Sequence, residues 1–298
     1  MEYIKGLDNY QDSKESAITL GKFDGLHIGH QKLVNKVCDL KKEYGVKSIV
    51  CAFDMHPAKE LMSNLERSIF LEDKVDALIE CPFTESLSKM RAEDFIRDIL
   101  WNHFRAKYIV VGTDFCFGHG KRGDIHMLSE YAQMYGYELF VIEKEMFQNR
   151  EISSSFIKEE LRQGNLSYVN QMLGYAYSIS GQVEHGKKLG RTLGFPTLNV
   201  CPDERKLLPP NGVYFVKVNV DDCWYNGICN VGTKPTVSEE QRILMETHLF
   251  DFEGEIYGKT VEIQFLQYER TEKKFGSIDD LKAQIELDRI NAINYFSA

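Results

Sequence analysis

The chain has 298 residues, of which 43% are hydrophobic and 27% charged, and its formal net charge is −9 at pH 7. This composition is ordinary for a globular protein, and the length suffices for two domains. The acidic balance argues against nucleic-acid binding, which needs a basic surface, and no apolar run reaches the ~18 residues that span a bilayer. An acidic chain that uses nucleotides is expected to rely on glycine loops, a few cations and Mg²⁺.

Cysteine usage and the N-terminus indicate the compartment. The seven cysteines include no CxxC pair, and an odd number without metal-ligand spacing suits a reducing environment. Residues 1–16 lack the apolar core of a signal peptide. We therefore expect a cytoplasmic protein with no membrane association.

The first 150 residues alternate short apolar runs with helical patterns. The runs are continuous and rich in branched residues, which is typical of buried parallel strands, and they cover residues 17–21, 47–53, 107–112 and 137–143. Helices are predicted over residues 28–43, 71–80, 91–104 and 124–136. This alternation predicts an α/β domain with a doubly wound parallel sheet that binds ligands at the carboxyl ends of its strands.

The pattern changes in the second half of the chain. A helical stretch from Ser153 to about Gly174 is expected to break near Gly164. Short alternating strands then predict a small antiparallel β-barrel, with strands over residues 177–186, 212–220, 223–232, 245–252 and 259–268. A C-terminal helix over 277–296 is predicted to cover the barrel through Ile278, Leu281, Ile285 and Ile293. We place the two domains at residues 1–175 and 176–298.

The decapeptide GKFDGLHIGH, residues 21–30, follows the first predicted strand and opens the first helix. Gly21, Gly25 and Gly29 lack a Cβ, so the backbone can approach an anion closely. The helix that begins here presents free N–H groups and the positive end of its dipole. His27 and His30 share one face of its first turn and can donate to the same phosphate. The spacing predicts a phosphate-binding turn.

This decapeptide resembles the HxGH signature of the nucleotidyltransferase superfamily. Its FDGxHxGH form resembles the adenylyltransferase half of bacterial bifunctional riboflavin kinase/FAD synthetases. The resemblance implies a Rossmann-like domain in which His27 and His30 are catalytic and steady the charge on the leaving pyrophosphate. It also implies that ATP phosphates lie against Gly21, Phe23, Gly25 and Gly29. His56, in AFDMHP, matches a further histidine of the family pattern.

Two later segments extend the resemblance. The sequence DFCFG at 114–118, with Gly123-Asp124 after it, resembles the family's DFxFG…GD element, which implies flavin binding by Asp114, Phe115 and Phe117. Residues 152–158 resemble the family's ISSTxIR motif, which implies contacts with ATP phosphates from Ser153, Ser154, Ser155 and Lys158. Here Ser155 replaces threonine and Lys158 replaces arginine. Because lysine lacks the bidentate fork of arginine, we expect weaker phosphate binding.

The segment GQVEHGKKLGRTLGFPTLNV, residues 181–200, resembles the riboflavin kinase signature GxVxxGxxxGRxLGFPTxN. Gly190 and Gly194 allow close approach to ATP phosphates. Thr197 and Asn199 alternate along an extended segment, so both point to one side, where two neutral oxygens can ligate Mg²⁺. The resemblance implies a riboflavin kinase barrel domain.

The remaining kinase motifs follow in family order. Residues 230–237 match the NxGxRPTV loop, and Glu246 aligns with the glutamate that the family uses as general base. Arg270, Glu272 and Phe275 match the RxExxF loop, which implies contacts with the flavin.

The resemblance covers residues 15 to 292 and implies a bifunctional enzyme of flavin biosynthesis. It would phosphorylate riboflavin with ATP to FMN and then adenylylate FMN to FAD, with Mg²⁺ as cofactor and no obligate protein partner. One alternative is riboflavin kinase activity alone, with an adenylyltransferase domain weakened at residues 151–158. Another is a non-catalytic flavin-binding or regulatory protein, which would need neither a metal ligand nor a base.

Overall fold

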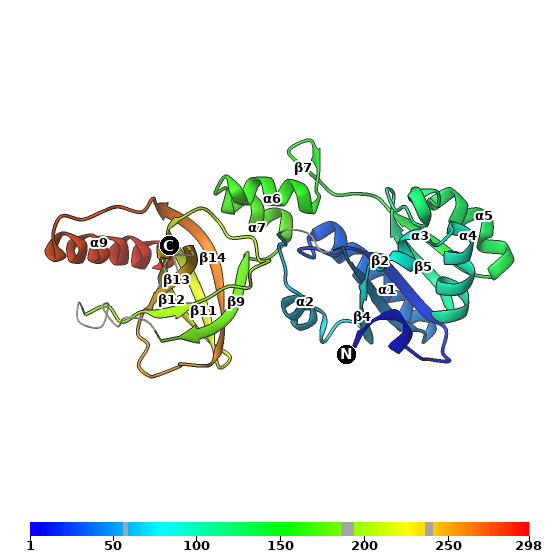
Figure 1. Cartoon of the computed structure of the whole chain (residues 1–298), viewed down its shortest axis with the longest axis horizontal. Coiled ribbons are helices and arrows are strands. Elements are labelled where there is room, and N and C mark those ends of the chain that lie inside the picture. The colour runs from blue at the N-terminus through cyan, green and yellow to red at the C-terminus, as the bar shows by residue number, and fades with distance from the viewer. Residues whose placement is uncertain (56–58, 186–193, 236–240, 298) are drawn as a thin grey trace. The chain divides into compact units, whose positions relative to one another are not determined.

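The computed structural model describes residues 1–55, 59–185, 194–235 and 241–297. Its contacts divide the chain into two compact units, Met1–Ser154 and Ser155–Ala298. None of the helices in these described ranges has the length and apolarity needed to cross a membrane. Each unit is built around its own sheet (Figure 1).

The first unit contains a six-stranded sheet in the order β1-β4-β3-β2-β5-β6, and every neighbouring pair is parallel. The strands are β1 (Glu2–Lys5), β2 (Ser16–Gly21), β3 (Lys47–Asp54), β4 (Ala77–Pro82), β5 (Ala106–Gly112) and β6 (Glu138–Ile142). After β2 the chain adds β3 and β4 on one side and then β5 and β6 on the other. The doubly wound sheet is confirmed, and its switch point lies between β2 and β5.

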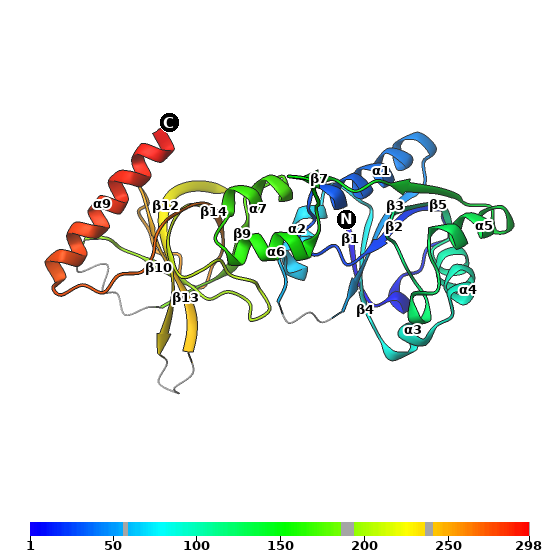
Figure 2. The ribbon, with the colours of Figure 1, turned by 90° about the horizontal axis from the view of Figure 1, so that it is seen from above.

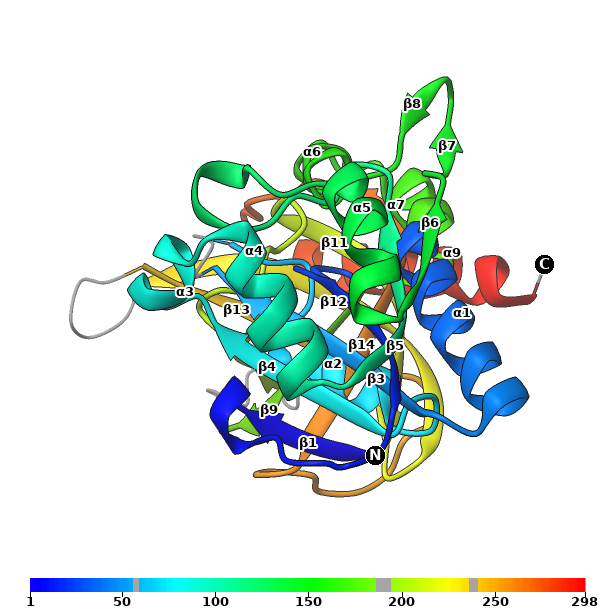
Figure 3. The same ribbon diagram turned by 90° about the vertical axis from the view of Figure 1, so that its right-hand side faces the viewer.

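Helices cover both faces of this sheet (Figures 2 and 3). Alternate strand residues such as Ile18, Ile49 and Ile109 join a core with the π-helical segment η2 (Phe95–His103) and with α5 (Ile125–Tyr135). The opposite face packs against α1 (Ile28–Tyr44) through its buried Leu33, Val34, Val37 and Leu40. Shorter elements are η1 (Leu7–Asn9), α2 (Asn64–Leu71), α3 (Glu85–Lys89), α4 (Ala92–Asp94), η3 (His119–Lys121), β7 (Met146–Phe147) and β8 (Arg150–Glu151).

The helix predicted over residues 71–80 is wrong. Helix α2 ends at Leu71, and Ala77–Pro82 forms β4, which lies between β1 and β3. A strand buried on both faces is a short continuous apolar run, which periodicity alone does not separate from a buried helix. The sequence also gave no sign of β1, whose Ile4 is the sole buried residue of a four-residue strand.

The switch point brings two motif-bearing turns together. Strand β2 pairs with β5 in a register that sets Thr19 beside Val110, so the carboxyl ends at Gly21 and Gly112 are neighbours. The turn at 22–27 and the loop at 113–124 therefore leave the same edge of the sheet. Ligands of open α/β sheets bind at such a point.

The second unit is a closed antiparallel barrel, as predicted, and its strand order is β10-β13-β12-β11-β14-β9. Its strands are β9 (Ser178–Glu184), β10 (Leu198–Val200), β11 (Gly212–Val220), β12 (Cys223–Pro235), β13 (Gln241–Leu249) and β14 (Thr260–Arg270). Helices α6 (Ser154–Arg162) and α7 (Leu166–Leu173) precede it, with the expected break near Gly164.

Helix α7 packs against the barrel. The Asn170 amide donates to the Phe265 carbonyl at 3.0 Å and accepts from the Tyr177 amide at 2.8 Å. By contacts, α6 and α7 thus group with the barrel, whereas the sequence placed the domain boundary at 175–176. That boundary stays a prediction about functional domains.

Helix α9 (Ile278–Ser297) lies along the barrel, as expected (Figure 1). Ile285 of the predicted apolar stripe packs against the barrel cluster that contains Phe215 and Ile228. Ile278 is 64% exposed and Ile293 is 39% exposed, so the predicted apolar stripe is wrong at those positions. The buried helix residues are Asp288 and Ala292, and Ala292 packs with Phe215 and Ile228 of the barrel. The Asp288 carboxylate accepts from Arg270 Nε at 2.8 Å and Nη2 at 2.6 Å. A buried ion pair, which the apolar spacing does not reveal, therefore adds to the apolar contacts that join α9 to the barrel.

We predict that Asp288→Asn lowers the free energy of unfolding of the second unit by about 3 kcal/mol, because it leaves the Arg270 guanidinium half-buried without a counter-charge. Urea unfolding in a Trp101→Phe background measures this, since Trp224 then reports the second unit alone. The control is Glu286→Gln, which breaks the half-exposed Glu286–Arg289 pair and is expected to cost less than about 0.5 kcal/mol. Equal losses in the two variants would contradict the role of Asp288.

Candidate active sites

The turn after β2 is held in a strained conformation. Phe23 and Leu26 have φ values of 47° and 36°, and Gly25 has 85°. Side chains with a Cβ occupy this region at a cost of about 1–3 kcal/mol each, so surrounding contacts must fix the turn. The Asp24 carboxylate accepts from the Leu61 amide at 2.7 Å, and the Asp24 carbonyl accepts from Ser154 Oγ at 2.7 Å.

The two histidines of this turn stack on each other at the start of α1. His27 is the N-cap residue and accepts from the His30 amide at 3.4 Å, and the two rings lie 3.7 Å apart at an angle of 21°. A Cβ on Gly29 would approach the His27 ring to 3.2 Å, so glycine at this position leaves room for the ring. His30 Nδ1 is buried, and no hydrogen-bond partner for it exists among the described residues. The pair thus retains a free polar group at a helix N-terminus.

Burial keeps both imidazoles neutral at pH 7. It lowers the pKa of His27 to about 4, against the opposing effect of Asp24 and Asp114. Burial also holds the pKa of His30 well below its usual value, helped by His27 and by the positive charge of Arg67. A neutral imidazole can donate one hydrogen bond, and the N-terminus of α1 beside it has the dipole direction that favours an anion.

The loop after β5 carries the three predicted flavin-binding residues, and they differ in exposure to solvent: Asp114 is exposed, Phe115 half-buried and Phe117 buried. Phe117 is buried, and the centroid of its ring is 5.2 Å from that of Phe95 and 5.7 Å from that of Phe115. A Cβ on Gly123 would come within 2.5 Å of the Phe117 ring, so the loop closes tightly over it. Phe117 therefore supports the loop from the core, and Phe115 is the more accessible ring of the two.

Asp114 is exposed and forms an ion pair with Lys144 at 3.0 Å. Lys144 also binds the Glu151 carboxylate at 2.7 Å. The acidic residue before the serine motif therefore has a cationic partner, which the sequence did not reveal.

The serine motif begins at the same turn. Ser154 is the first residue of α6 and donates to the Asp24 carbonyl, so the structure brings this serine to the histidine turn. Ser155 and Lys158 follow on α6 in the second unit, where Ser155 is exposed and Lys158 half-buried. His56 lies outside the described residues.

In the barrel, strand register brings distant polar residues to one level. Asn199 of β10 lies opposite Glu184 of β9 and opposite Glu246 of β13, and Glu246 in turn lies opposite Asn230 of β12. Directly opposed residues share a face of the sheet. The predicted metal ligand Asn199 and the predicted base Glu246 are therefore adjacent in the barrel, although they are 47 residues apart in the sequence.

Asn199 has the properties of a ligand for a hard cation. It is 6% exposed, and its Oδ1 finds no hydrogen-bond partner in the part of the chain that the structure describes. An orphaned amide oxygen beside the half-buried Glu246 and near Thr197 fits Mg²⁺, which prefers oxygen ligands. The described ranges contain no cluster of three or more His, Cys, Asp or Glu side chains that would hold a metal by themselves. A Mg²⁺ ion at Asn199 and Glu246 would therefore take its remaining oxygen ligands from other groups, such as water or substrate phosphates.

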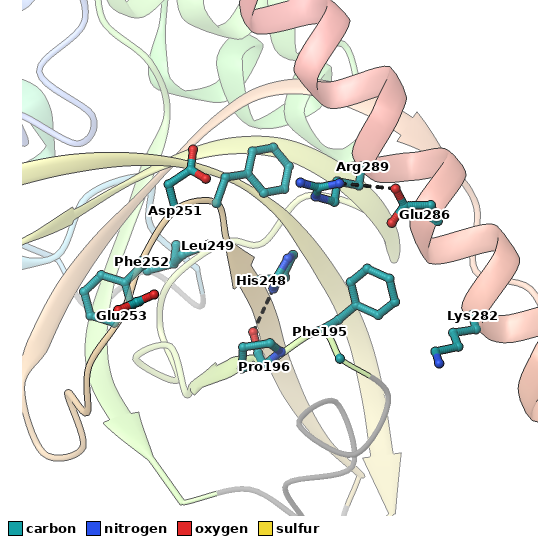
Figure 4. Close-up of a pocket in the computed structure, with 12 residues that line it drawn as sticks. Phe195, Pro196, His248, Leu249, Asp251, Phe252, Glu253, Lys282, Glu286 and Arg289 are labelled. Atoms are coloured by element: carbon teal, nitrogen blue, oxygen red, sulfur yellow. Dashed lines mark hydrogen bonds and ion pairs between the residues drawn. The ribbon is translucent and has the colours of Figure 1, made fainter.

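The barrel unit also has a cavity of about 630 Å³ (Figure 4), lined in part by His248, which is two residues after Glu246 on β13. Gly194, Phe195 and Pro196 form one wall, His248 to Glu253 another, and Lys282, Glu286 and Arg289 of α9 a third. His248 is joined to the Pro196 carbonyl through Nδ1 at 2.8 Å, which ties β13 to the segment before Thr197. Gly194 has φ +87°, and no atom of the described residues lies within 4 Å of where its Cβ would be. Gly190 lies outside the described residues. The cavity size is within the range of small-molecule sites.

The RxExxF residues divide into two groups. The guanidinium of Arg270 is bound to Asp288 through Nε and Nη2, so it holds α9. Glu272 instead accepts from the Asn230 amide at 3.1 Å, and a Cβ on Gly232 would meet its carboxylate. Because Asn230 lies opposite Glu246, Glu272 is at the same end of the barrel as the predicted base. Phe275 is half-buried beyond it.

Two family models match the chain: one for FAD synthetase over residues 9–156 and one for riboflavin kinase over residues 173–296. A Haemophilus influenzae protein is 36% identical over 313 residues, and the match covers 100% of both chains. A Bacillus subtilis protein is 35% identical over 300 residues, and the match covers 96% of this chain and 94% of the relative. Both are named bifunctional riboflavin kinase/FMN adenylyltransferase. The chain belongs to this family. Its resemblance to the family is thus confirmed over the whole length.

Among solved structures, a Streptococcus pneumoniae protein described as a macrolide-efflux protein matches with a TM-score of 0.89. It is 27% identical and the match covers 99% of each chain. The arrangement of an FAD synthetase domain followed by a riboflavin kinase barrel with a C-terminal helix is confirmed.

In the FAD synthetase domain, sequence reasoning missed one further pair of charged residues. Arg67 of α2 and Glu80 of β4 form an ion pair at 2.7 Å in which each side chain is 5% exposed. A glutamate within the apolar run ALIECP was the available signal, because a buried acid needs a partner.

We predict that the first unit loses stability as pH falls from about 6.5 to about 4, because the unfolded chain then binds protons that the buried His27 does not accept. A pKa depressed from 6.5 to about 4 corresponds to a loss of about 3 kcal/mol over that window. The variant His27→Asn keeps an N-cap oxygen but removes the titrating group, so its stability should fall less steeply. Urea unfolding in a Trp224→Phe background, with Trp101 as reporter, measures the slope. Identical slopes in both proteins would exclude His27 as the cause.

Proposed function

We propose that this chain phosphorylates riboflavin with ATP to give FMN and ADP, and then joins FMN to the AMP moiety of a second ATP to give FAD and pyrophosphate. The observation that carries the proposal is the line Asn199–Glu246–Asn230 across three barrel strands, with an unsatisfied Asn199 oxygen beside a carboxylate. Simple flavin storage requires neither group. The stacked histidines at the N-terminus of α1 support the second reaction.

For the kinase reaction, we assign Glu246 as general base. It would accept the proton of the riboflavin 5′-hydroxyl as that oxygen attacks the γ-phosphorus and ADP leaves. Thr197 and Asn199 would hold Mg²⁺, which neutralises charge on the transferred phosphoryl group when bound. Neutral oxygens suit this task, because the metal then keeps its charge for the phosphates.

The cavity beside Gly194 is a suitable place for the base and ribose of ATP. Its rings at Phe195, Phe250 and Phe252 offer apolar contact to a base. Its charged side chains are of both signs, and Arg289 is paired with Glu286 at 3.2 Å. The flavin would lie toward Glu272 and Phe275, at the end of the barrel where Glu272 contacts Asn230. A direct flavin contact by Arg270 stays a prediction, since two of its donor nitrogens already bind Asp288.

For adenylyl transfer, a phosphate oxygen of FMN attacks the α-phosphorus of ATP and pyrophosphate leaves. The protein mainly positions the two anions and stabilises their charge. We assign this to His27, His30 and the turn containing Gly21, Phe23, Gly25 and Gly29. Ser153, Ser154, Ser155 and Lys158 would add donors to the triphosphate. Asp114 and Phe115 would hold the flavin, with the buried Phe117 supporting their loop from the core.

Several attributes follow from these assignments. The substrates are ATP, riboflavin and FMN, Mg²⁺ is the metal, and no obligate protein partner is needed. The seven cysteines are all free thiols, which supports a reducing cytoplasmic location. A chain that made FMN but no FAD would be a kinase alone, and a chain that made neither would be a flavin-binding protein.

We predict that Glu246→Gln lowers the rate of FMN formation at least 100-fold, because the amide no longer accepts the hydroxyl proton. FAD formation from supplied FMN should remain within about two-fold of the wild type. Chromatographic separation of riboflavin, FMN and FAD measures both rates in one assay. The control is Glu262→Gln on β14, which removes a carboxylate elsewhere in the barrel. Parallel loss of both activities would argue against separate sites.

The complementary prediction concerns the first unit. His30→Ala should lower FAD formation by about 100-fold or more, because it removes a donor to the triphosphate, and should leave FMN formation unchanged. His126→Ala, at an exposed position of α5, is the control. The same chromatographic assay with FMN and MgATP measures the effect. Full activity of the His30 variant would remove this histidine from the mechanism.

A further inference from the structure

Arg67 links the histidine turn to the sheet interior. Helix α2 places its side chain in the core, where Nη1 donates to both Glu80 oxygens at 2.7 and 2.9 Å. The same nitrogen donates to Asn64 Oδ1 at 3.1 Å. On the other side of the guanidinium, Nε donates to the Phe23 carbonyl at 3.3 Å. One side chain therefore connects β4, α2 and the turn after β2.

The Phe23 carbonyl is a sensitive point of the turn. Phe23 has a φ of 47°, a conformation that a residue with a Cβ keeps only when its surroundings enforce it. Its fully buried ring lies 5.2 Å from the His30 ring. Fixing this carbonyl therefore fixes the direction in which the chain enters the segment with Asp24, Gly25 and His27, and it fixes the ring against which His30 packs.

A buried ion pair is weak evidence for stability, because desolvation of both charges offsets their attraction. Apolar residues of similar size would fill the same space between α2 and β4. They would not supply a donor to the Phe23 carbonyl, which would then be a buried, unsatisfied acceptor. The placement of this costly pair beside the strained turn points to a role in the site.

We propose that Arg67 is a positioning residue for adenylyl transfer, with Glu80 holding the guanidinium and the guanidinium holding the Phe23 carbonyl. The pair fixes the turn so that His27, His30 and the N–H groups of α1 face the triphosphate. This inference rests on the proposed adenylyltransferase function of the first unit. Arg67 itself acts through the turn and needs no contact with substrate.

Arginine is suited to this position and lysine is not. The guanidinium sends Nε and Nη1 in different directions from one rigid plane, whereas an ammonium is a single charged point. Arg67→Lys keeps the attraction to Glu80 and loses the second direction. Arg67→Met loses both. The two variants therefore separate the charge from the geometry.

The experiment uses the full chain, whose kinase activity serves as an internal reference. Arg67→Met is expected to lower kcat/KM for MgATP in FAD formation by about 10–100-fold, mainly through kcat, since a misplaced turn reduces transition-state contacts. Arg67→Lys should show a smaller loss, and FMN formation should stay within about two-fold. The control is Leu128→Ala, which removes a fully buried side chain of α5 in the core of the same unit, away from the turn. All rates are taken where each variant is folded by circular dichroism.

Hydrogen exchange supplies a readout that is independent of catalysis. The amides of His30 and Gln31 both donate to His27, so they should exchange faster in both Arg67 variants and at the wild-type rate in Leu128→Ala. Unchanged exchange, or a loss of FAD formation no greater than that of Leu128→Ala, would overturn the proposal. A wild-type chain that makes no FAD would count against the proposed function, and the exchange data alone would then decide whether Arg67 fixes the turn.

Discussion

In both units, the register of paired strands brings together side chains that the sequence keeps apart. The pairing of β2 with β5 places the histidine turn and the aspartate loop at one edge of the sheet. The three-residue strand β10 places Asn199 between Glu184 and Glu246. A slip of one residue in β10 would turn Asn199 to the other face and replace it with Leu198 or Val200. The chemistry of each site therefore depends on hydrogen bonds between backbones.

Burial then sets the charge state of the groups that register has placed. The histidines are neutral because they are withdrawn from water, and Asn199 presents an oxygen that is free for a cation. In the reactions proposed above, anionic ligands would be received by neutral donors, a helix dipole and Mg²⁺. Such an arrangement would allow a chain with a net charge of −9 to use polyanionic substrates.

Local spacing placed His27 and His30 on one face, because residues three apart in a helical turn are neighbours, and their rings are stacked in the structure. The roles of these histidines, and a shared side for Thr197 and Asn199, stay predictions. Local spacing failed where long-range contacts decide. Residues 77–82 form an internal strand because they pair with β1 on one side and β3 on the other. Asp288 of α9 is buried because it forms an ion pair with Arg270 of β14. Arg67, Glu80 and Lys144 were missed because their partners are distant in sequence. Phe117 matched a motif, yet its ring belongs to the core.

The position of β1 has a consequence for synthesis of the chain. Residues 2–5 form the edge of the sheet, and their strand partner is β4, which the ribosome completes only at Pro82. Until then the amino-terminal segment has no partner strand, and β2 and β3 can pair before it joins them. Edge strands with open hydrogen-bonding groups are prone to pair with other chains. A bulky protein fused before β1 would therefore be expected to slow the pairing of β1 with β4. A protein fused after α9 would follow a helix, which needs no strand partner.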